Sequence, residues 1–492
     1  MTEIELFLDR HRISWEHNVD RHLNHPAKYE GNPILEPRHP WEDSYVTVYG
    51  SVLARGGGGF GLWYMAGARG MQADQMMCYA ESDDGLTYRR VMSRANPYPG
   101  AAPTNIVLGP EPNVHGPCVI ENQHSDDPSV RYLLLYDSYP TYRPELAETL
   151  QGSRWCYSAT SADGLTWTPR LGRPAIAGKS DIGQCVVWDQ THRRYIAYLR
   201  GTRGTQVSPA SVETQRVRYV RAAWSNDFLH WSEPVETFRC DEQDGDPHHQ
   251  AHQLSVTRRG DQFVGILSIF RIEQFIPMPR HKLVMEEGPI QTQLVVSRDG
   301  LDWRRVADRQ EFLLRGGAGQ WDSYWLVTAD RIVYDDKRML IYYAASSARR
   351  CDLPHYNPGS PPGARYRIGA ATLPRDRFQA LRPRRLFQPA VLETKPLAFQ
   401  PGELRLNADA SLGRITVELC DFNGQTIEGF SQADCTPVAR DDLEQVVRWR
   451  GRPLSDAVDP SKVFQRRIRV RFYLHHASLF AAHWPLAEEE VA

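Results

Sequence analysis

The sequence lacks the features that mark membrane, secreted and nucleic-acid-binding proteins. No run of 18 apolar residues appears, and residues 1–20 mix Asp, Glu, Arg and His with their apolar side chains, so we expect neither a membrane span nor a secretory signal. Lys plus Arg number 58 and Asp plus Glu 60, a formal net charge of -2. This balance gives no electrostatic reason to expect nucleic acid or a membrane surface as a partner.

Cysteine is scarce and scattered. The eight Cys residues contain no Cys-x-x-Cys pair, which argues against a zinc ribbon and against a disulfide framework. We therefore expect a cytoplasmic protein with reduced thiols that requires no cofactor.

Turn-forming and aromatic residues, by contrast, are plentiful. The 36 Gly and 34 Pro supply turns for many short strands, and 492 residues are enough for two to four domains. The 13 Trp and 22 Tyr fit packing between β-sheets, and they also fit sugar binding, because a ring face stacks on the apolar face of a pyranose. This composition favours an all-β protein.

A short pattern, Ser-x-Asp-Gly-x-x-aromatic, recurs along the chain. It begins at Ser82, Ser161 and Ser297, and a variant at Ser225 has Phe228 in place of the Gly. The pattern predicts a tight hairpin in which Asp bonds local backbone, Gly takes a positive φ and the aromatic packs on its own sheet. Successive copies lie 64 to 79 residues apart, the length of a four-stranded propeller blade with generous loops.

The repeat sets the predicted domain organisation. Five units fit residues 31–385, the fifth ending at Ile368 to Phe378, and predict a five-bladed β-propeller after an N-terminal arm of residues 1–30. Residues 386–485 alternate apolar and polar side chains between hairpin turns, which predicts a C-terminal β-sandwich. Within it, Cys420 to Phe430 has hairpin chemistry and no convergent acids, which favours a packing role over a sugar-binding one.

Each predicted blade begins with a distinctive segment, here called the blade opening. The five openings are GNPILEPRHPWED (31–43), NIVLGPEPNVHGP (105–117), KSDIGQCVVWD (179–189), DEQDGDPHHQAHQ (241–253) and GGAGQWDS (316–323). With the repeat, they make the chain resemble the five-bladed propeller glycoside hydrolases, the superfamily of invertases, levansucrases, arabinanases and xylosidases. The likeness is strongest to invertase-like proteins with a C-terminal β-sandwich. The Trp-Met-Asn-Asp-Pro, Arg-Asp-Pro and Glu-Cys motifs of invertases are absent.

Carboxylates stand at four of the openings. In a propeller the innermost strand of each blade borders the axis, so polar residues at the openings converge, and glycosidic cleavage needs two carboxyl groups. The candidates for catalysis are Glu42, Asp181, Asp246 and Asp322. For Asp181 and Asp322 the alternative is a turn or cap that bonds local backbone, and for Glu42 a solvated loop.

Aromatic and histidine residues at the same openings are candidates for holding the sugar. They are Trp41, His115, His248, His249 and Trp321. The histidines of the fourth opening, with Asp246 and His252, match no zinc motif well, so hydrogen bonding to sugar hydroxyls is the favoured role. A structural cation in the axial channel is left open by the resemblance.

Together these features predict a glycoside hydrolase that removes a terminal sugar from an oligosaccharide or glycoside. A glycan phosphorylase or lyase on the same scaffold is one alternative, although few cations other than histidine occur at the openings. A non-catalytic carbohydrate-binding protein is another, because a fold does not fix a function.

Overall fold

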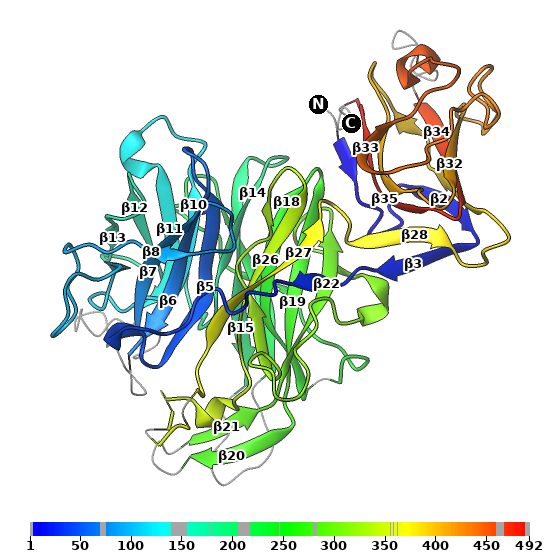
Figure 1. Cartoon of the computed structure of the whole chain (residues 1–492). Helices are drawn as coiled ribbons and strands as arrows, with labels where there is room; N and C mark the ends of the chain where they lie inside the picture. Colours follow the sequence, from blue (N-terminus) through cyan, green and yellow to red (C-terminus); the bar gives the residue numbers. More distant parts are fainter. Residues whose placement is uncertain are drawn as a thin grey trace.

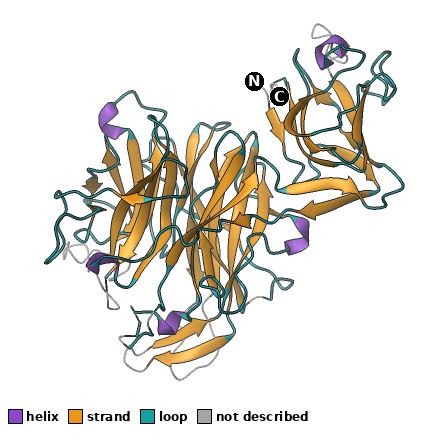
Figure 2. Ribbon diagram, viewed as in Figure 1, coloured by secondary structure: helices purple, strands orange, loops and turns teal. Residues whose placement is uncertain are grey.

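The protein is described by a computed structural model for residues 3–68, 75–138, 155–178, 180–204, 217–245, 247–278, 283–354, 356–357, 359–361, 363–458 and 467–487. It is built almost entirely of antiparallel strands (Figure 2). The helical elements in these ranges are single turns: η1 (Pro40–Glu42), η2 (Pro128–Val130), η5 (Ala307–Arg309), η6 (Arg350–Asp352) and η7 (Leu454–Ala457). No helix in the described ranges is long and apolar enough to cross a membrane.

Five antiparallel sheets form the blades of a propeller (Figure 1). Blade 1 is β5 (Tyr45–Ala54), β6 (Phe60–Gly67), β7 (Gln75–Ser82) and β8 (Arg89–Arg90), with β9 (Ile106–Leu108) beside β7. Blade 2 is β10 (His115–Glu121), β11 (Tyr132–Ser138), β12 (Trp155–Ser161) and β13 (Thr168–Arg170). Blade 3 is β14 (Cys185–Asp189), β15 (Arg194–Arg203), β16 (Val217–Ser225), β17 (Val235–Phe238). Blade 4 is β18 (His249–Arg259), β19 (Gln262–Arg271), β22 (Ile290–Ser297), β23 (Arg304–Arg305). Blade 5 is β24 (Trp325–Thr328), β26 (Arg338–Ser346), β27 (Arg367–Pro374), β4 (Ala27–Lys28), with β25 (Val333–Tyr334) beside β26.

The blades close into a ring. The first strand of each blade is innermost: β5 packs on β10 and β24, and β14 packs on β10 and β18. Blade 4 meets blade 5 where β22 packs on β24. The outermost strand of blade 5 is β4, from the N-terminal part of the chain, so the two ends of the propeller segment are joined in one sheet. The predicted five-bladed propeller is confirmed.

The repeated Ser-x-Asp-Gly turns have the predicted hairpin geometry. In the first copy Asp84 Oδ1 accepts hydrogen bonds from the backbone N–H groups of Leu86 (2.8 Å) and Thr87 (2.7 Å). The Gly position is left-handed in every copy, at φ 75° to 76° for the glycines and 64° for Phe228. The three glycine carbonyls also accept a bond from an aromatic side chain of the preceding blade: Trp63 to Gly164, Tyr198 to Gly300 and Tyr342 to Gly85. The turn therefore links neighbouring blades, which explains its repetition.

These turns make stability sensitive to acid. Burial acts to raise the pKa of Asp84, but the N–H groups of Leu86 and Thr87 outweigh it and lower that pKa to about 2, and the pKa values of Asp163 and Asp299 are lowered in the same way. The pKa of Asp84 in the folded protein lies below its ordinary value of 3.8. The ionised carboxylate therefore stabilises the fold fully above pH 4, and this stabilisation is lost as pH falls toward 2.

We expect the melting temperature to fall over this pH range, and to fall less in a triple variant with Asn at positions 84, 163 and 299. Asn still accepts the turn hydrogen bonds but does not titrate. Melting curves from pH 6 to pH 2 test this, with Asp83→Asn, an exposed neighbour, as the control. Equal slopes for the triple variant and the wild type would contradict it.

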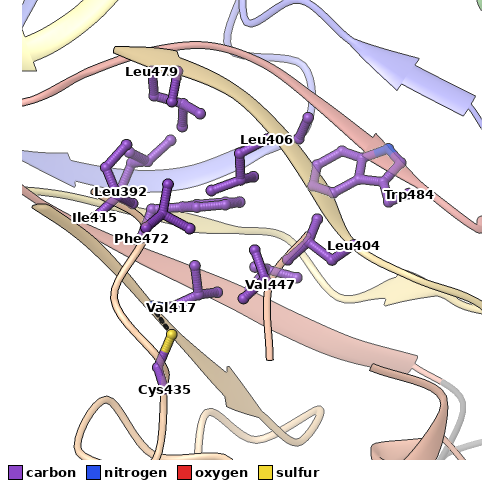
Figure 3. Packing of buried hydrophobic residues seen from close by; sticks show 14 of the residues in the cluster. Leu392, Leu404, Leu406, Ile415, Val417, Cys435, Val447, Phe472, Leu479 and Trp484 are labelled. Carbon is purple, nitrogen blue, oxygen red and sulfur yellow. Dashed lines mark hydrogen bonds between the residues drawn. The ribbon is translucent and has the colours of Figure 1, made fainter. Parts of the chain in front are cut away.

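Apart from the hairpin of β20 (Gln274–Met278) and β21 (Leu283–Glu287), the remaining strands form a sandwich of two sheets that encloses an apolar core (Figure 3). One sheet contains β1 (Glu3–Glu5), β3 (Val19–Leu23), β28 (Gln379–Pro383), β31 (Arg405–Asp409), β33 (Asp441–Val446) and β35 (Ser478–Trp484). The other contains β2 (Ile13–His17), β29 (Ala390–Thr394), β30 (Leu397–Ala398), β32 (Arg414–Cys420) and β34 (Arg467–His475). In the core Phe472 and Trp484 both pack edge-on against Phe7.

The N-terminal segment does not form a separate arm, which corrects the boundary expected at residue 30. Strands β1, β2 and β3 pair with β35, β29 and β28 of the sandwich, and β4 belongs to blade 5. The sandwich also begins earlier than residue 386, because β28 lies in its sheet. The partner strands lie more than 300 residues away along the chain, so no local pattern reveals the pairing.

The sandwich contacts the propeller at the outer turn between β18 and β19. Arg12 pairs with Asp261 at 2.7 Å, and Arg298 pairs with Asp9 at 2.8 Å and with Asp261 at 3.0 Å. These residues lie near the C-terminal end of β18, whereas its first residue, His249, lies at the other end. The sandwich is therefore attached away from the N-terminal ends of the inner strands (Figure 1).

Candidate functional site

The N-terminal ends of the five inner strands meet at one end of the propeller axis. Polar side chains from blades 1 to 4 gather there, and we call them the axial mouth: Tyr49, His115, Asp181, Arg200 and His252. Blade 5 contributes Trp325, whose ring lies edge-on to His252 at 5.4 Å. The axial mouth together with Trp325 thus draws on all five blades, as expected for a propeller site.

Asp181 is the carboxylate of the axial mouth. Its Oδ2 accepts a hydrogen bond from Arg200 Nη2 at 2.6 Å, and its Oδ1 lies 3.9 Å from His115 Nε2. The side chain is 30% exposed, although its partners are buried. The backbone is left-handed, with φ 62°, and its N–H donates to the buried carboxylate of Asp137. A non-glycine residue held at positive φ is common where a side chain is positioned for function.

Tyr49 reaches the axial mouth because β5 is irregular. The pairing of β5 with β6 shifts register between Thr47 and Ser51, and such a bulge redirects a side chain. Gly50 within the bulge lies so near the carbonyl of Trp63 that a Cβ would approach its oxygen to 2.0 Å. A larger residue there would therefore displace Tyr49.

Tyr49 and His252 form an uncharged hydrogen-bonded pair, with 2.9 Å between the hydroxyl oxygen and Nε2. Burial, reinforced by the positive charges of Arg200, Arg218 and Arg350, holds the pKa of His252 well below its ordinary value. Burial also raises the pKa of Tyr49 to about 12. Both side chains stay neutral near pH 7, so they act as hydrogen-bonding groups, a property suited to sugar hydroxyls.

Two arginines near this pair, Arg218 and Arg350, are bonded to glutamates. Arg218 pairs with Glu286 of β21 (Leu283–Glu287), which forms a hairpin with β20 (Gln274–Met278), and donates to Gln250 at 2.6 Å. Arg350 stacks over Trp325 at 5.2 Å, and its backbone N–H donates to Glu287 at 3.2 Å. Glu286 and Glu287 are thus bonded and buried, so they brace the site and do not face a ligand.

Glu42 lies outside the axial mouth, which corrects its assignment as a catalytic carboxylate. It is fully buried and accepts two hydrogen bonds from Arg90 at 2.9 Å, one from Tyr64 at 2.6 Å and one from the backbone N–H of Arg38 at 2.9 Å. Arg90 lies on the outer strand of its blade. No carboxylate lone pair is left for a substrate, so Glu42 is structural.

Asp322 has the same kind of environment, and its assignment is corrected likewise. It is 2% exposed and accepts hydrogen bonds from Lys28 on the outer strand β4 at 2.5 Å and from Tyr343 at 3.0 Å. In blade 4 the corresponding acid is Asp244, which pairs with Arg305 of β23 and with Arg309 at 2.7 Å. Three openings therefore use a buried acid to fasten the loop to a cation near the outer edge.

The two predicted sugar-stacking tryptophans belong to these buried loops. Trp41 is 2% exposed, donates to Asn105 Oδ1 at 3.0 Å and stacks on His39. Trp321 stacks on Tyr343 at 5.7 Å. Their rings are occupied by the protein, so neither is placed to stack on a sugar at the axial mouth.

The candidate residues of the fourth opening lie in different environments. Asp246 lies outside the described residues, so its catalytic role stays a prediction. His248 is exposed, and His249 Nδ1 is bonded to the carbonyl of Asp244. Of the histidines, His115 and His252 enter the axial mouth, the first as predicted from its place in the second opening.

The axis is packed below the axial mouth. The buried carboxylate of Asp330 accepts hydrogen bonds from Ser51 at 2.6 Å and from Arg331 at 2.5 Å and 3.0 Å. The guanidinium of Arg331 therefore neutralises the channel carboxylate. In the part of the chain that is described, no group of three or more His, Cys, Asp or Glu side chains could hold a metal ion.

Sequence reasoning missed Tyr49 and did not place Arg200 beside Asp181. The position of Tyr49 depends on a bulge in β5, and the sequence of that strand does not indicate the bulge. Arg200 lies on β15, the second strand of its blade. The apolar run of that strand continues to Leu199, and an Arg directly after such a run is the available signal in the sequence.

Comparison with known proteins shows similarity in fold. No model of a protein family matches the chain, and no curated protein is similar to it in sequence. An N-acetylgalactosamine deacetylase from F. plautii, in complex with blood group B trisaccharide, has 15% identity and a TM-score of 0.49 over 72% of this chain and 96% of its own. A glycosyl hydrolase from Bacteroides ovatus has 15% identity and a TM-score of 0.44 over 72% and 95%. A structure from the GH130 family of mannoside phosphorylases, which contains glycoside hydrolases, has 14% identity and a TM-score of 0.43 over 71% and 94%.

Proposed function

We propose that this protein is a carbohydrate-active enzyme that hydrolyses a glycosidic bond at the axial mouth. The observation that carries the proposal is Asp181: a partly exposed carboxylate with left-handed backbone, paired with Arg200 and lying in the axial mouth with the uncharged Tyr49–His252 pair. This arrangement is what an oligosaccharide with many hydroxyls requires.

The ion pair assigns Asp181 a role. A guanidinium 2.6 Å away stabilises the ionised carboxylate, which suits a nucleophile or a base that activates water. The leaving oxygen then needs a proton from a second carboxyl group. Asp246, an acid of the fourth opening, is our candidate for that donor.

The test is product analysis with the full-length protein. Aryl glycosides and neutral and uronate-containing oligosaccharides are incubated with inorganic phosphate present and absent. Release of a free sugar that does not depend on phosphate, and that is lost in Asp246→Asn, is the expected result. A sugar 1-phosphate formed only when phosphate is present would show that the reaction is phosphorolysis and not hydrolysis. An unsaturated uronate would show that the reaction is elimination. No product from any substrate would overturn the enzyme assignment.

A further inference from the structure

A second surface with features of a ligand site lies on the sandwich. An open cavity of about 460 Å³ is bordered by Arg10, Ser14, Trp15, Glu16, Asn18 and Arg384, and we call it the Trp15 cavity. Its residues come from β2, from the segments on either side of it and from the loop after β28. None of them takes part in the axial mouth.

Large apolar side chains are exposed beside this cavity. Trp15 is 44% exposed, whereas Ile13, two residues earlier on the same strand, is buried in the core. In the loop after β28, Leu386 is 62% exposed and Phe387 is 99% exposed. A Trp left half in water on the edge strand of a sheet retains apolar surface that a ligand can cover.

Asn18 holds the loop in a fixed shape. Its side chain bonds the loop at four points: Nδ2 donates to the carbonyls of Arg385 (3.1 Å), Gln388 (2.8 Å) and Pro389 (3.4 Å), and Oδ1 accepts from the N–H of Arg385 (2.9 Å). Asn18 itself is left-handed, at φ 54°. Phe387 is therefore presented by an ordered loop, so little conformational entropy is lost when it binds.

Charged side chains border the Trp15 cavity beside Trp15. Glu16 pairs with Arg10 and, at 2.8 Å, with Arg21. In the described structure Arg384 donates one hydrogen bond, to the carbonyl of Val19 at 3.1 Å. A guanidinium carries five N–H donors, so Arg384 has further donors for a ligand.

We propose that the Trp15 cavity binds a carbohydrate chain, with Trp15 and Phe387 stacking on sugar rings and Arg10, Glu16 and Arg384 bonding their hydroxyls. Exposed aromatic faces beside charged and hydroxyl side chains fit a ligand with alternating apolar faces and polar edges. The biological role of this cavity rests on the proposed function, because the sandwich would then be a second binding surface for a polymeric substrate of the enzyme.

The position of the cavity separates it from catalysis. The sandwich is attached near Arg259 to Asp261, at the end of blade 4 opposite His252. A glycan held at Trp15 therefore does not occupy the axial mouth. The contribution of the Trp15 cavity is to keep the enzyme bound to a long polysaccharide.

The experiment measures binding of the full-length protein carrying Asp181→Asn, so that cleavage of the probe is slow during the measurement. The probes are arabinan, xylan, mannan and polygalacturonate, tested by affinity electrophoresis and titration calorimetry. We expect at least one of them to bind, and Trp15→Ala to weaken that binding about tenfold. Phe422→Ala is the matched control, because Phe422 is an aromatic residue of the same domain with 43% exposure, and it should bind like the parent.

Three outcomes would overturn the inference. They are failure of every probe to bind, unchanged binding by Trp15→Ala, and an equal loss in Phe422→Ala. Self-association that disappears in Phe387→Ala, with no polysaccharide bound, would instead assign this surface to contacts between copies of the chain. Because the readout is binding, it is independent of whether Asp181 cleaves a glycoside.

Discussion

Replacement of Asp181 by Asn is expected to lower the rate of glycoside cleavage by about 10²- to 10⁴-fold. Asn has the same shape and tolerates the left-handed backbone that Asp181 adopts, so the fold should be retained. What is lost is the negative charge that a nucleophile or base needs. The comparison is kcat/KM on the best substrate from the product screen, with circular dichroism and melting temperature to confirm folding.

The control for this prediction removes an acid of the same type elsewhere. Asp83→Asn changes an exposed residue of a blade 1 turn and should leave the rate unchanged. Arg200→Met tests the ion pair, because the carboxylate then loses the guanidinium that holds it in position, and the rate should fall. Full activity in Asp181→Asn would remove Asp181 from the mechanism.

Replacement of Glu42 by Gln is expected to reduce the free energy of unfolding by about 3–5 kcal/mol. The buried carboxylate neutralises Arg90 and accepts four hydrogen bonds, so the amide leaves a cation without its counter-charge in the interior. Denaturant midpoints of wild type and variant measure this loss. Asp83→Asn, with the same charge change on the surface of the same blade, should change the free energy of unfolding by less than about 0.5 kcal/mol.

The same variant distinguishes a structural from a catalytic role for Glu42. The fraction of Glu42→Gln that remains folded should retain the kcat of the wild type. A variant of unchanged stability that had lost its activity would contradict the structural assignment, and would return Glu42 to the candidate catalytic residues.

The candidate site could be predicted only in part, and the reasons differ between residues. Asp181 and His115 were found because they stand directly before or at the start of an inner strand, and position along the chain fixes which end of the axis a strand terminus reaches. Glu42 and Asp322 stand in equivalent positions but lie in closed ion pairs. The cations that bind them, Arg90 and Lys28, are on outer strands distant in sequence, so no spacing rule separates them from Asp181.

By itself the sequence determined the all-β class, the five blades and the repeated Ser-x-Asp-Gly hairpin turn. All three depend on local hydrogen bonding and on apolar periodicity, which recur with each copy of the pattern. Tertiary structure alone decided that the first residues complete both the sandwich and blade 5, because those strands bury their apolar faces against segments far along the chain. It also decided which acid stays open to solvent, since the partner of a buried charge is set by packing between strands and not by its neighbours in the chain.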